Sequence, residues 1–205
     1  CSCNFVAAKD YFSKILKDEK KKYYLSNEDY IKMLRQLGSI SANLYNFDEA
    51  IFYAETGLKL LPKIKKNSLH RAELFKIIGY CYARQNNFKK SKYYFEKSLA
   101  AIVSLENIDK IALEAELYAQ LSMLYGITFL HKDPRHQAIK YALKALELSN
   151  KLLKIHIKMK MKKKSKYDME DYSIKHRWAL GLAYNQFDDY EKAISQGFRP
   201  GMEMI

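Results

Sequence analysis

An internal repeat is the feature that most constrains the fold of this chain. The segments 34–62 and 75–102 share the same order of residues, and a shorter segment at 177–197 follows it again. Each has a Leu–Gly or Ile–Gly pair, a short polar turn that ends in an aromatic residue, and then a small residue within another apolar stretch. This pattern predicts two helices per segment. Because one such unit cannot bury its apolar face alone, several units must stack.

These residues resemble the tetratricopeptide repeat (TPR), whose helix–turn–helix unit carries a Leu-Gly pair, a Tyr, an Ala and a final Pro at fixed spacing. The first copy supplies Leu34, Leu37, Gly38, Phe47, Ala50, Ala54, Leu58 and Pro62. The second supplies Phe75, Ile78, Gly79, Tyr82, Phe88, Ser91, Phe95 and Leu99. A looser third copy supplies Tyr118, Leu121, Ser122, Tyr125, Ala138, Ala142, Ala145 and Leu146, with extra residues at the turn 131–134. The fourth supplies Leu180, Gly181, Tyr184, Tyr190 and Ala193.

The resemblance implies an all-α fold, a TPR-like right-handed α-solenoid of about four repeats. The small residues Ala50, Ser91, Ala138 and Ala193 lie 41, 47 and 55 residues apart, so the helices or their connections must be longer than in the family. We place the array at 26–205, with repeats at 27–62, 70–104, 111–163 and 171–200.

The first 25 residues are expected to form an N-terminal tether and a packing helix. The apolar residues from Phe5 to Leu16 fall on one helical face. The stretch Ser26–Asp29 then resembles a capping box that begins the next helix.

The opening residues CSCN resemble the mature start of a bacterial lipoprotein, in which the first cysteine carries the lipid. This resemblance implies a lipid anchor at Cys1, membrane attachment and a place in the cell envelope. The alternative is a fragment boundary that falls on Cys1, in which case a cytoplasmic TPR regulator is expected.

The composition favours helices and excludes several classes of protein. Hydrophobic residues make up 48% and charged residues 29%, which excludes a disordered chain, and Gly and Pro are scarce at 7 and 3. Stretches of 18 apolar residues, as needed to span a membrane, are absent from the sequence. The net charge of +13 is spread along the chain, which is weaker evidence for nucleic-acid binding than one compact patch.

The sequence carries no pattern typical of catalysis, of a metal site or of cofactor binding. Its five histidines have no metal-ligand spacing, and it lacks a glycine-rich phosphate loop and a nucleophile elbow. We expect His131 and His136 at the surface and Cys81 as a buried small residue. The chain is therefore predicted to be a non-enzyme without cofactors.

In the TPR family, ligands usually bind a concave groove lined by the first helix of each repeat. The resemblance implies a partner protein, bound as a peptide or helix. The solvent-facing positions of these helices are Lys32, Arg35, Ser39, Asn43, Lys76, Tyr80, Ala83, Arg84, Ala119, Met123, Trp178 and Leu182. Arg35 matches one basic member of the family's carboxylate clamp, but Ser39 and Tyr80 replace its asparagines. Alternatively, the cations form a solvated face and Trp178 packs between helices.

A basic run at Lys151–Lys166 holds eight lysines and no acid. The apolar residues Leu148, Leu152, Ile155 and Met159 continue the stripe of the preceding helix, and a basic stripe runs beside it. Residues 155–162 also alternate, which is typical of a strand. We favour a helix that frays near 164–166. Its basic surface is Lys151, Lys154, Lys158 and Lys162. The alternative function is binding of an anionic membrane surface or, less favoured, nucleic acid.

Overall fold

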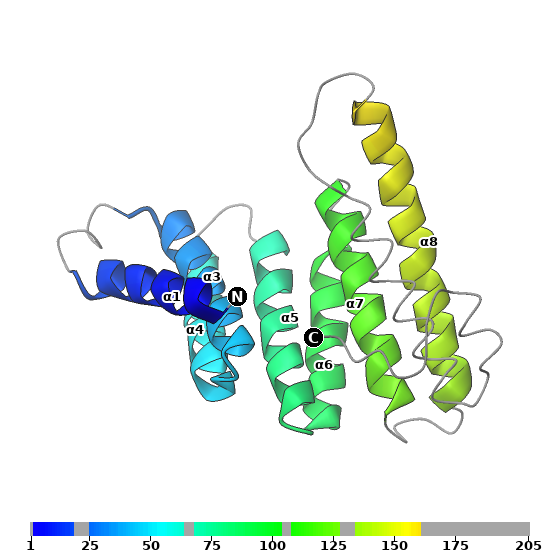
Figure 1. The fold of residues 1–205 in the computed structure, drawn as a ribbon, viewed down its shortest axis with the longest axis horizontal. Helices are drawn as coiled ribbons and strands as arrows, with labels where there is room; N and C mark the ends of the chain where they lie inside the picture. Colours follow the sequence, from blue (N-terminus) through cyan, green and yellow to red (C-terminus); the bar gives the residue numbers. More distant parts are fainter. Residues whose placement is uncertain (1, 19–24, 64–67, 104–107, 128–133, 161–205) are drawn as a thin grey trace. The chain divides into compact units, whose positions relative to one another are not determined.

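The computed structural model describes residues 2–18, 25–63, 68–103, 108–127 and 134–160, and within them it forms seven α-helices and one 3-10 helix (Figure 1). The predicted all-α class is confirmed. The chain divides into two compact units, Cys1–Leu105 and Glu106–Ile205, and each is described by itself.

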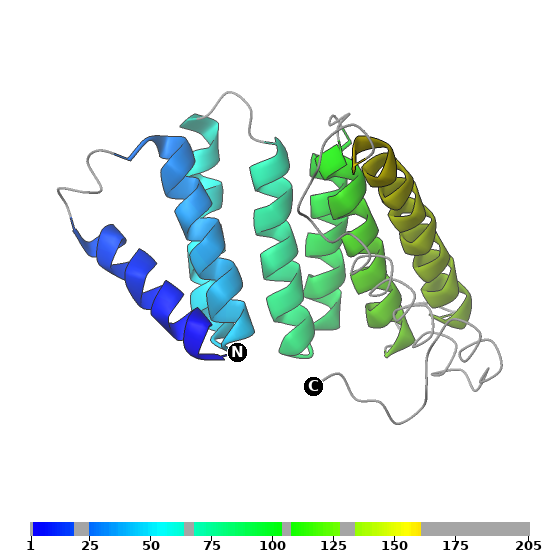
Figure 2. The ribbon, with the colours of Figure 1, turned by 45° about the horizontal axis from the view of Figure 1, so that its top comes forward.

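The first unit contains two helical hairpins and an N-terminal helix. The first hairpin is α3 (Asn27–Asn43) with α4 (Phe47–Leu60), which the 3-10 helix η1 (Leu61–Lys63) follows. The second is α5 (Ser68–Arg84) with α6 (Phe88–Ala101). Helix α5 packs against both α3 and α4, so the two hairpins share one core (Figures 1 and 2).

The two hairpins have the same turn. Tyr45 and Asn86, 41 residues apart, both adopt a left-handed backbone, with φ values of 62° and 59°. The amide N–H of the next residue, Asn46 or Asn87, donates to the carbonyl of Ser41 or Tyr82 at 2.9 and 2.8 Å. The two predicted repeats therefore have the same backbone geometry at their turns.

Small residues allow the helices of each hairpin to approach closely. Ala50 and Ser91, the predicted small residues of the second helices, are fully buried. A Cβ on Gly38 would lie 3.4 Å from the Ala50 carbonyl oxygen, and one on Gly79 only 2.7 Å from Cδ1 of Phe95. The hydroxyl of Ser98 donates to the carbonyl of Ala72 at 2.6 Å, which joins α6 to α5.

The predicted N-terminal helix is confirmed as α1 (Ser2–Lys17), which packs against α3. Its apolar face from Ala8 to Leu16 is half-buried, whereas Phe5 is exposed. The predicted cap of α3 is also confirmed, since the Asp29 amide N–H donates to Oγ of Ser26 at 3.1 Å.

Glu49 connects α1 to the first hairpin. It accepts from Lys9 Nζ of α1 at 2.5 Å, and from the hydroxyls of Ser41 and Tyr53 at 3.1 Å each. Burial raises the pKa of Glu49, but these three hydrogen bonds outweigh it and hold the pKa below its ordinary value. The carboxylate therefore stabilises the folded state in its ionised form.

Acidification is expected to lower the free energy of unfolding, partly because Glu49 becomes protonated. A folded-state pKa below the unfolded one gives stability that is present above the unfolded pKa and lost as the pH falls through the folded pKa. Urea midpoints between pH 7 and 3 should therefore fall less steeply in Glu49→Gln than in the unmodified chain. Glu55→Gln, on the exposed side of α4, is the control. Parallel pH profiles for all three proteins would exclude this role of Glu49.

The second unit contains, within its described residues, one long hairpin of α7 (Ile108–Gly126) and α8 (Pro134–Lys160). The hydroxyl of Ser122 donates to the carbonyl of Ala138 at 2.8 Å, and the rings of Tyr118 and Tyr141 stack with centroids 5.7 Å apart. Ala138, Ala142 and Ala145 are fully buried, as the looser third copy predicts.

Helix α8 includes the first ten residues of the basic run, 151–160. The prediction that this part of the run is a helix and not a strand is therefore confirmed. Leu152 is 1% exposed, with Leu148 and Ile155 half-buried on the predicted stripe, while Lys151 and Lys154 are exposed. The predicted fraying at 164–166 and the fourth repeat at 171–200 lie outside the described residues.

Candidate partner-binding surface on α3 and α5

The first helices of the two hairpins, α3 and α5, lie side by side and expose neighbouring stripes of residues. On α3 none of the four predicted groove residues is buried, whereas Leu34, Leu37 and Gly38 between them are. On α5 the predicted residues are half-buried or exposed, and Ile77, Ile78 and Gly79 are buried. We call this the α3–α5 surface: Lys32, Arg35, Ser39, Asn43, Glu73, Lys76, Tyr80 and Arg84.

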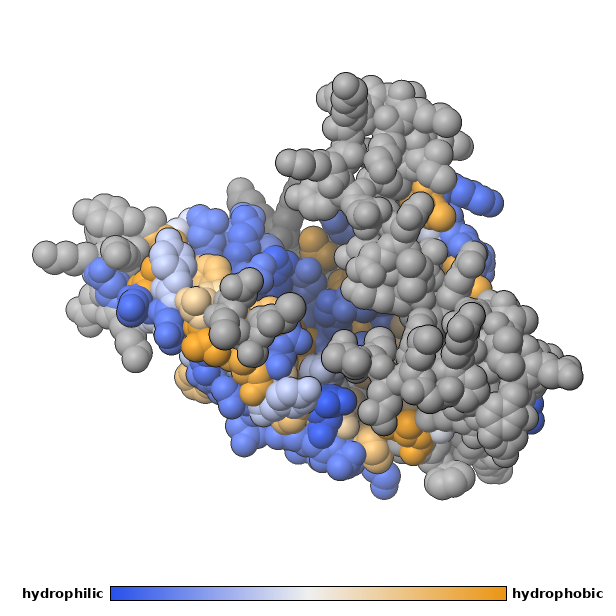
Figure 3. All heavy atoms as spheres, viewed as in Figure 1, coloured by the Kyte–Doolittle hydropathy of each residue, from blue (hydrophilic) through white to orange (hydrophobic). Residues whose placement is uncertain are grey.

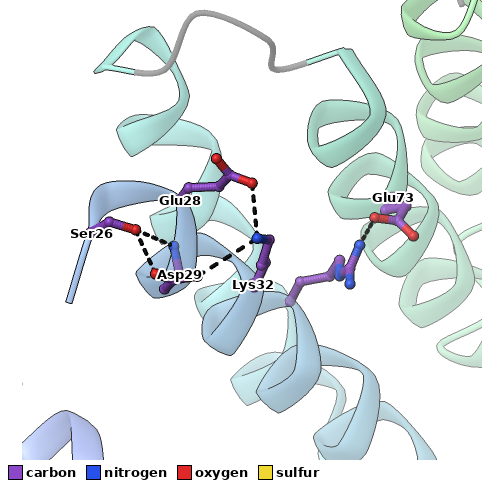
Figure 4. A network of polar contacts seen from close by, with 6 residues as sticks. Ser26, Glu28, Asp29, Lys32 and Glu73 are labelled. Atoms are coloured by element: carbon purple, nitrogen blue, oxygen red, sulfur yellow. Dashed lines mark hydrogen bonds and ion pairs between the residues drawn. The ribbon is translucent and has the colours of Figure 1, made fainter.

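Arg35 and Glu73 form an ion pair that joins the two helices (Figure 4). Both side chains are partly buried, at 22% and 24% exposed. Burial lowers the pKa of Arg35, yet the guanidinium stays charged at neutral pH because its ordinary pKa is far higher. The sequence reading did not identify Glu73, although its position three residues before Lys76 places it on the same helical face.

Lys32 lies at the start of the surface and is held within its own helix. Its Nζ is 2.8 Å from Oε1 of Glu28 and 3.6 Å from Oδ1 of Asp29 (Figure 4). These contacts are exposed and contribute little to stability, because solvent screens them. They nevertheless place two carboxylates beside the lysine, so this end of the surface carries both signs of charge.

Arg84 lies at the other end of the surface and contacts the turn of the first hairpin. Its guanidinium carbon lies 5.6 Å from the ring centroid of Tyr45, within the range of a cation–π contact. The neighbouring Gln85 side-chain amide donates to Oδ1 of Asp48 at 2.8 Å. Tyr45 is 67% exposed and adds an aromatic side chain that the sequence reading did not place here.

A buried histidine, His70 of α5, lies near the same surface. It is 9% exposed, and among the described residues its Nδ1 has no hydrogen-bond partner. Burial lowers the pKa of His70, and the charge of Arg35 lowers it further, so the ring is neutral at neutral pH. His136 is exposed as predicted, and His131 lies outside the described residues.

The α3–α5 surface carries charges of both signs. Two of its four cations lie beside carboxylates, Lys32 beside Glu28 and Asp29, and Arg35 beside Glu73. On the visible side of the first unit, hydrophilic side chains surround smaller hydrophobic patches (Figure 3). Such a surface suits a partner with complementary charges of both signs.

The remaining predicted site residues fall elsewhere. Met123 is half-buried on α7 of the second unit. Ala119 is 8% exposed and packs against Ala145, so the prediction that it faces solvent is wrong. Ala83 is half-buried on α5, and Lys158 lies in α8. Cys1, Lys162, Trp178 and Leu182 lie outside the described residues.

Within the part of the chain that the structure describes, three or more potential metal ligands do not come together at any point. None of the helices there is long and apolar enough to cross a membrane. Cys81 is fully buried, as predicted.

The thiol of Cys81 is expected to be unreactive in the folded protein. Burial raises its pKa to about 12, with a smaller contribution from the charge of Asp48. The thiolate fraction at neutral pH is then about a thousandfold lower than for a free cysteine. In a variant with Cys1→Ser and Cys3→Ser, a thiol reagent should label Cys81 rapidly in urea and very slowly in buffer. Equal labelling rates in the two conditions would contradict its burial.

The sequence and the structure of the chain were compared with those of known proteins. No protein-family model and no curated protein sequence matches the chain. Among solved structures, BtubC (BKLC) from P. vanneervenii is similar over 98% of this chain and 78% of its own, with a TM-score of 0.66 at 17% identity. The chain has a TPR-like helical-repeat fold. A Podospora anserina protein, described as a kinesin light chain candidate with nearly identical TPR-like repeats, gives a TM-score of 0.49 at 13% identity, covering 96% of this chain and 92% of its own.

Proposed function

We propose that this protein is an interaction module that binds a segment of a partner protein on the α3–α5 surface. A TPR-like fold suggests an interaction or scaffold role. The observation that carries the site is the pair of adjacent stripes on α3 and α5, which their own hairpins leave uncovered. We also propose that the role is non-catalytic, since proteins with this fold typically act by binding.

The charges of the surface point to the chemistry of the partner. Arg35 is already paired with Glu73, which leaves it poorly suited to clamp a free terminal carboxylate. Lys76 and Arg84 lie further along α5, and Arg84 contacts Tyr45 through its guanidinium. We therefore propose an internal segment with charges of both signs, and not a chain terminus, as the ligand.

Pull-down from membranes of the native organism, quantified by mass spectrometry, tests this proposal. Lys76→Glu with Arg84→Glu reverses two charges on the α3–α5 surface and should abolish recovery of the partner. Lys151→Glu with Lys154→Glu makes the same change of charge on exposed residues of α8 and should leave recovery intact. Unchanged recovery with the first variant would dismiss the surface.

The second variant also tests the alternative site. Lys151 and Lys154 are exposed on α8, so a basic helical face exists there for anionic membrane surfaces or nucleic acid. Binding through phosphates falls steeply as salt rises. Loss of salt-sensitive binding to anionic vesicles or RNA in Lys151→Glu with Lys154→Glu, with partner recovery unaffected by the α3–α5 variant, would favour this alternative.

Lipidation of Cys1 and a place in the cell envelope stay predictions from the sequence. Mass spectrometry of the N-terminal peptide of the native protein tests them. An acylated Cys1 is the expected result, and an extended, unprocessed N-terminus would exclude the anchor.

A further inference from the structure

A row of aromatic rings lies on the side of α5 away from the α3–α5 surface. Phe75 and Tyr82, two helical turns apart on α5, both contact Tyr94 of α6, with ring centroids 6.0 and 5.6 Å apart. At about 100° per residue, positions 75 and 82 point roughly opposite to positions 73 and 80. The row is therefore a separate face of the first unit.

Two lysines of α6 cover this row. Lys90 Nζ lies 4.9 Å from the ring centroid of Tyr82, and Lys97 Nζ lies 5.5 Å from that of Phe75 and 4.6 Å from that of Tyr93. Both lysines are exposed. The cation–π contacts orient their stems along the rings and leave the ammonium groups in solvent.

A cavity of about 450 Å³ opens at the Phe75 end of the row. This volume lies within the range of natural ligand pockets, which is about 300–1,000 Å³. Most of its wall is apolar, and two cations, Arg71 and Lys97, form part of its lining. Its lining residues are Leu58, Pro62, Arg71, Phe75, Lys97, Ala100 and Ala101.

The charge around the cavity is unbalanced. Arg71 and Lys97 are exposed, and neither forms an ion pair within the described ranges. Glu96, one residue before Lys97, is within 3.7 Å of Lys92 instead. Burial raises the pKa of Tyr94, with smaller contributions from Tyr82 and from Glu55 of α4. The cavity thus combines apolar walls with two cations that form no ion pair with a carboxylate of the described residues.

We infer that this groove is a second binding site, which takes an acidic segment of a partner protein. An apolar side chain of that segment fills the cavity beside Leu58 and Phe75, and adjoining carboxylates pair with Arg71 and Lys97. Charge-assisted hydrogen bonds are stronger than neutral ones, and charge complementarity of this kind selects an acidic partner over a basic one. Lys90 and Lys97 cover the ring faces on which nucleic-acid bases would have to stack, which favours a peptide over a single-stranded nucleic acid.

Selection from a library of short random peptides on the full chain tests the inference. Enriched peptides should carry an apolar residue flanked by Asp or Glu, and a synthetic consensus peptide should bind in fluorescence anisotropy. Arg71→Glu with Lys97→Glu should weaken that binding about tenfold to a hundredfold, because two attractive charge pairs become repulsive. Arg135→Glu with Lys140→Glu makes the same change of charge at exposed positions of α8, and this control should bind as the unmodified chain does.

A second variant separates binding from folding. Ala100→Phe places a large side chain at an exposed position of the cavity wall without changing any charge, and should weaken the peptide as strongly. Far-UV circular dichroism confirms that each variant is folded. Failure to enrich acidic peptides, or unchanged affinity in both cavity variants, would overturn the inference. Binding of anionic vesicles, lost in Arg71→Glu with Lys97→Glu, without any enrichment of acidic peptides would replace it with a lipid-headgroup site.

Discussion

Replacing Phe95 with alanine is expected to lower the free energy of unfolding by about 3–5 kcal/mol, the usual range for a buried phenylalanine. Its side chain is 0% exposed and lies directly over Gly79 of the neighbouring helix. Removing the ring leaves a cavity at the contact between α5 and α6. Urea unfolding followed by far-UV circular dichroism measures the loss. A change below about 1 kcal/mol, as is usual for surface sites, would contradict the packing.

Gly79 supplies the matched test of this contact. In the unmodified chain, Gly79→Ala should destabilise by about 1–2 kcal/mol, because overpacking against Phe95 outweighs the better helix propensity of alanine. In the Phe95→Ala background the same substitution should instead stabilise, by up to about 1 kcal/mol. Gly38→Ala, whose Cβ would meet its neighbours at 3.4 Å or more, should be close to neutral. A penalty for Gly79→Ala that persists without the ring would show that another contact sets it.

Replacing Leu152 with alanine is expected to cost about 2–5 kcal/mol. Leu152 is 1% exposed although it lies within the basic run, so the α8 stripe is packed there as the rest of the helix is. Lys151→Ala, at the exposed neighbouring position, should change stability by less than about 0.5 kcal/mol. Hydrogen exchange of the α8 amides before and after the substitution is a second measurement. Equal effects of the two substitutions would show that this part of α8 is not packed.

The sequence predicted the hairpins because their signals are local. Gly38 and Gly79 precede their turns, Ala50 and Ser91 follow them, and each acts through the shape of its own hairpin. The helix through Leu152 was predictable for the same reason, since its apolar stripe continues at helical spacing.

The site was less predictable because its contacts join distant parts of the chain. Periodicity identifies the face on which Arg35 lies, but not that Glu73, 38 residues away, reaches it from the next helix. The burial of His70 and Ala119 likewise depends on the neighbouring helix. Helical periodicity therefore predicts which face of a helix a residue lies on, but not which residue of another helix it will contact.

The shared turn of the two hairpins has a consequence for how this chain presents side chains. One turn is built from Leu44, Tyr45 and Asn46 and the other from Gln85, Asn86 and Asn87, yet their backbone hydrogen bonds coincide. Asparagine tolerates the left-handed conformation well, whereas tyrosine adopts it at a cost of about 1 kcal/mol. The same main-chain hydrogen bonds thus form at both bends whatever the side chain, and position 45 holds an aromatic ring that is 67% exposed. At each hairpin bend the side chain can therefore differ while the backbone that carries it keeps the same conformation.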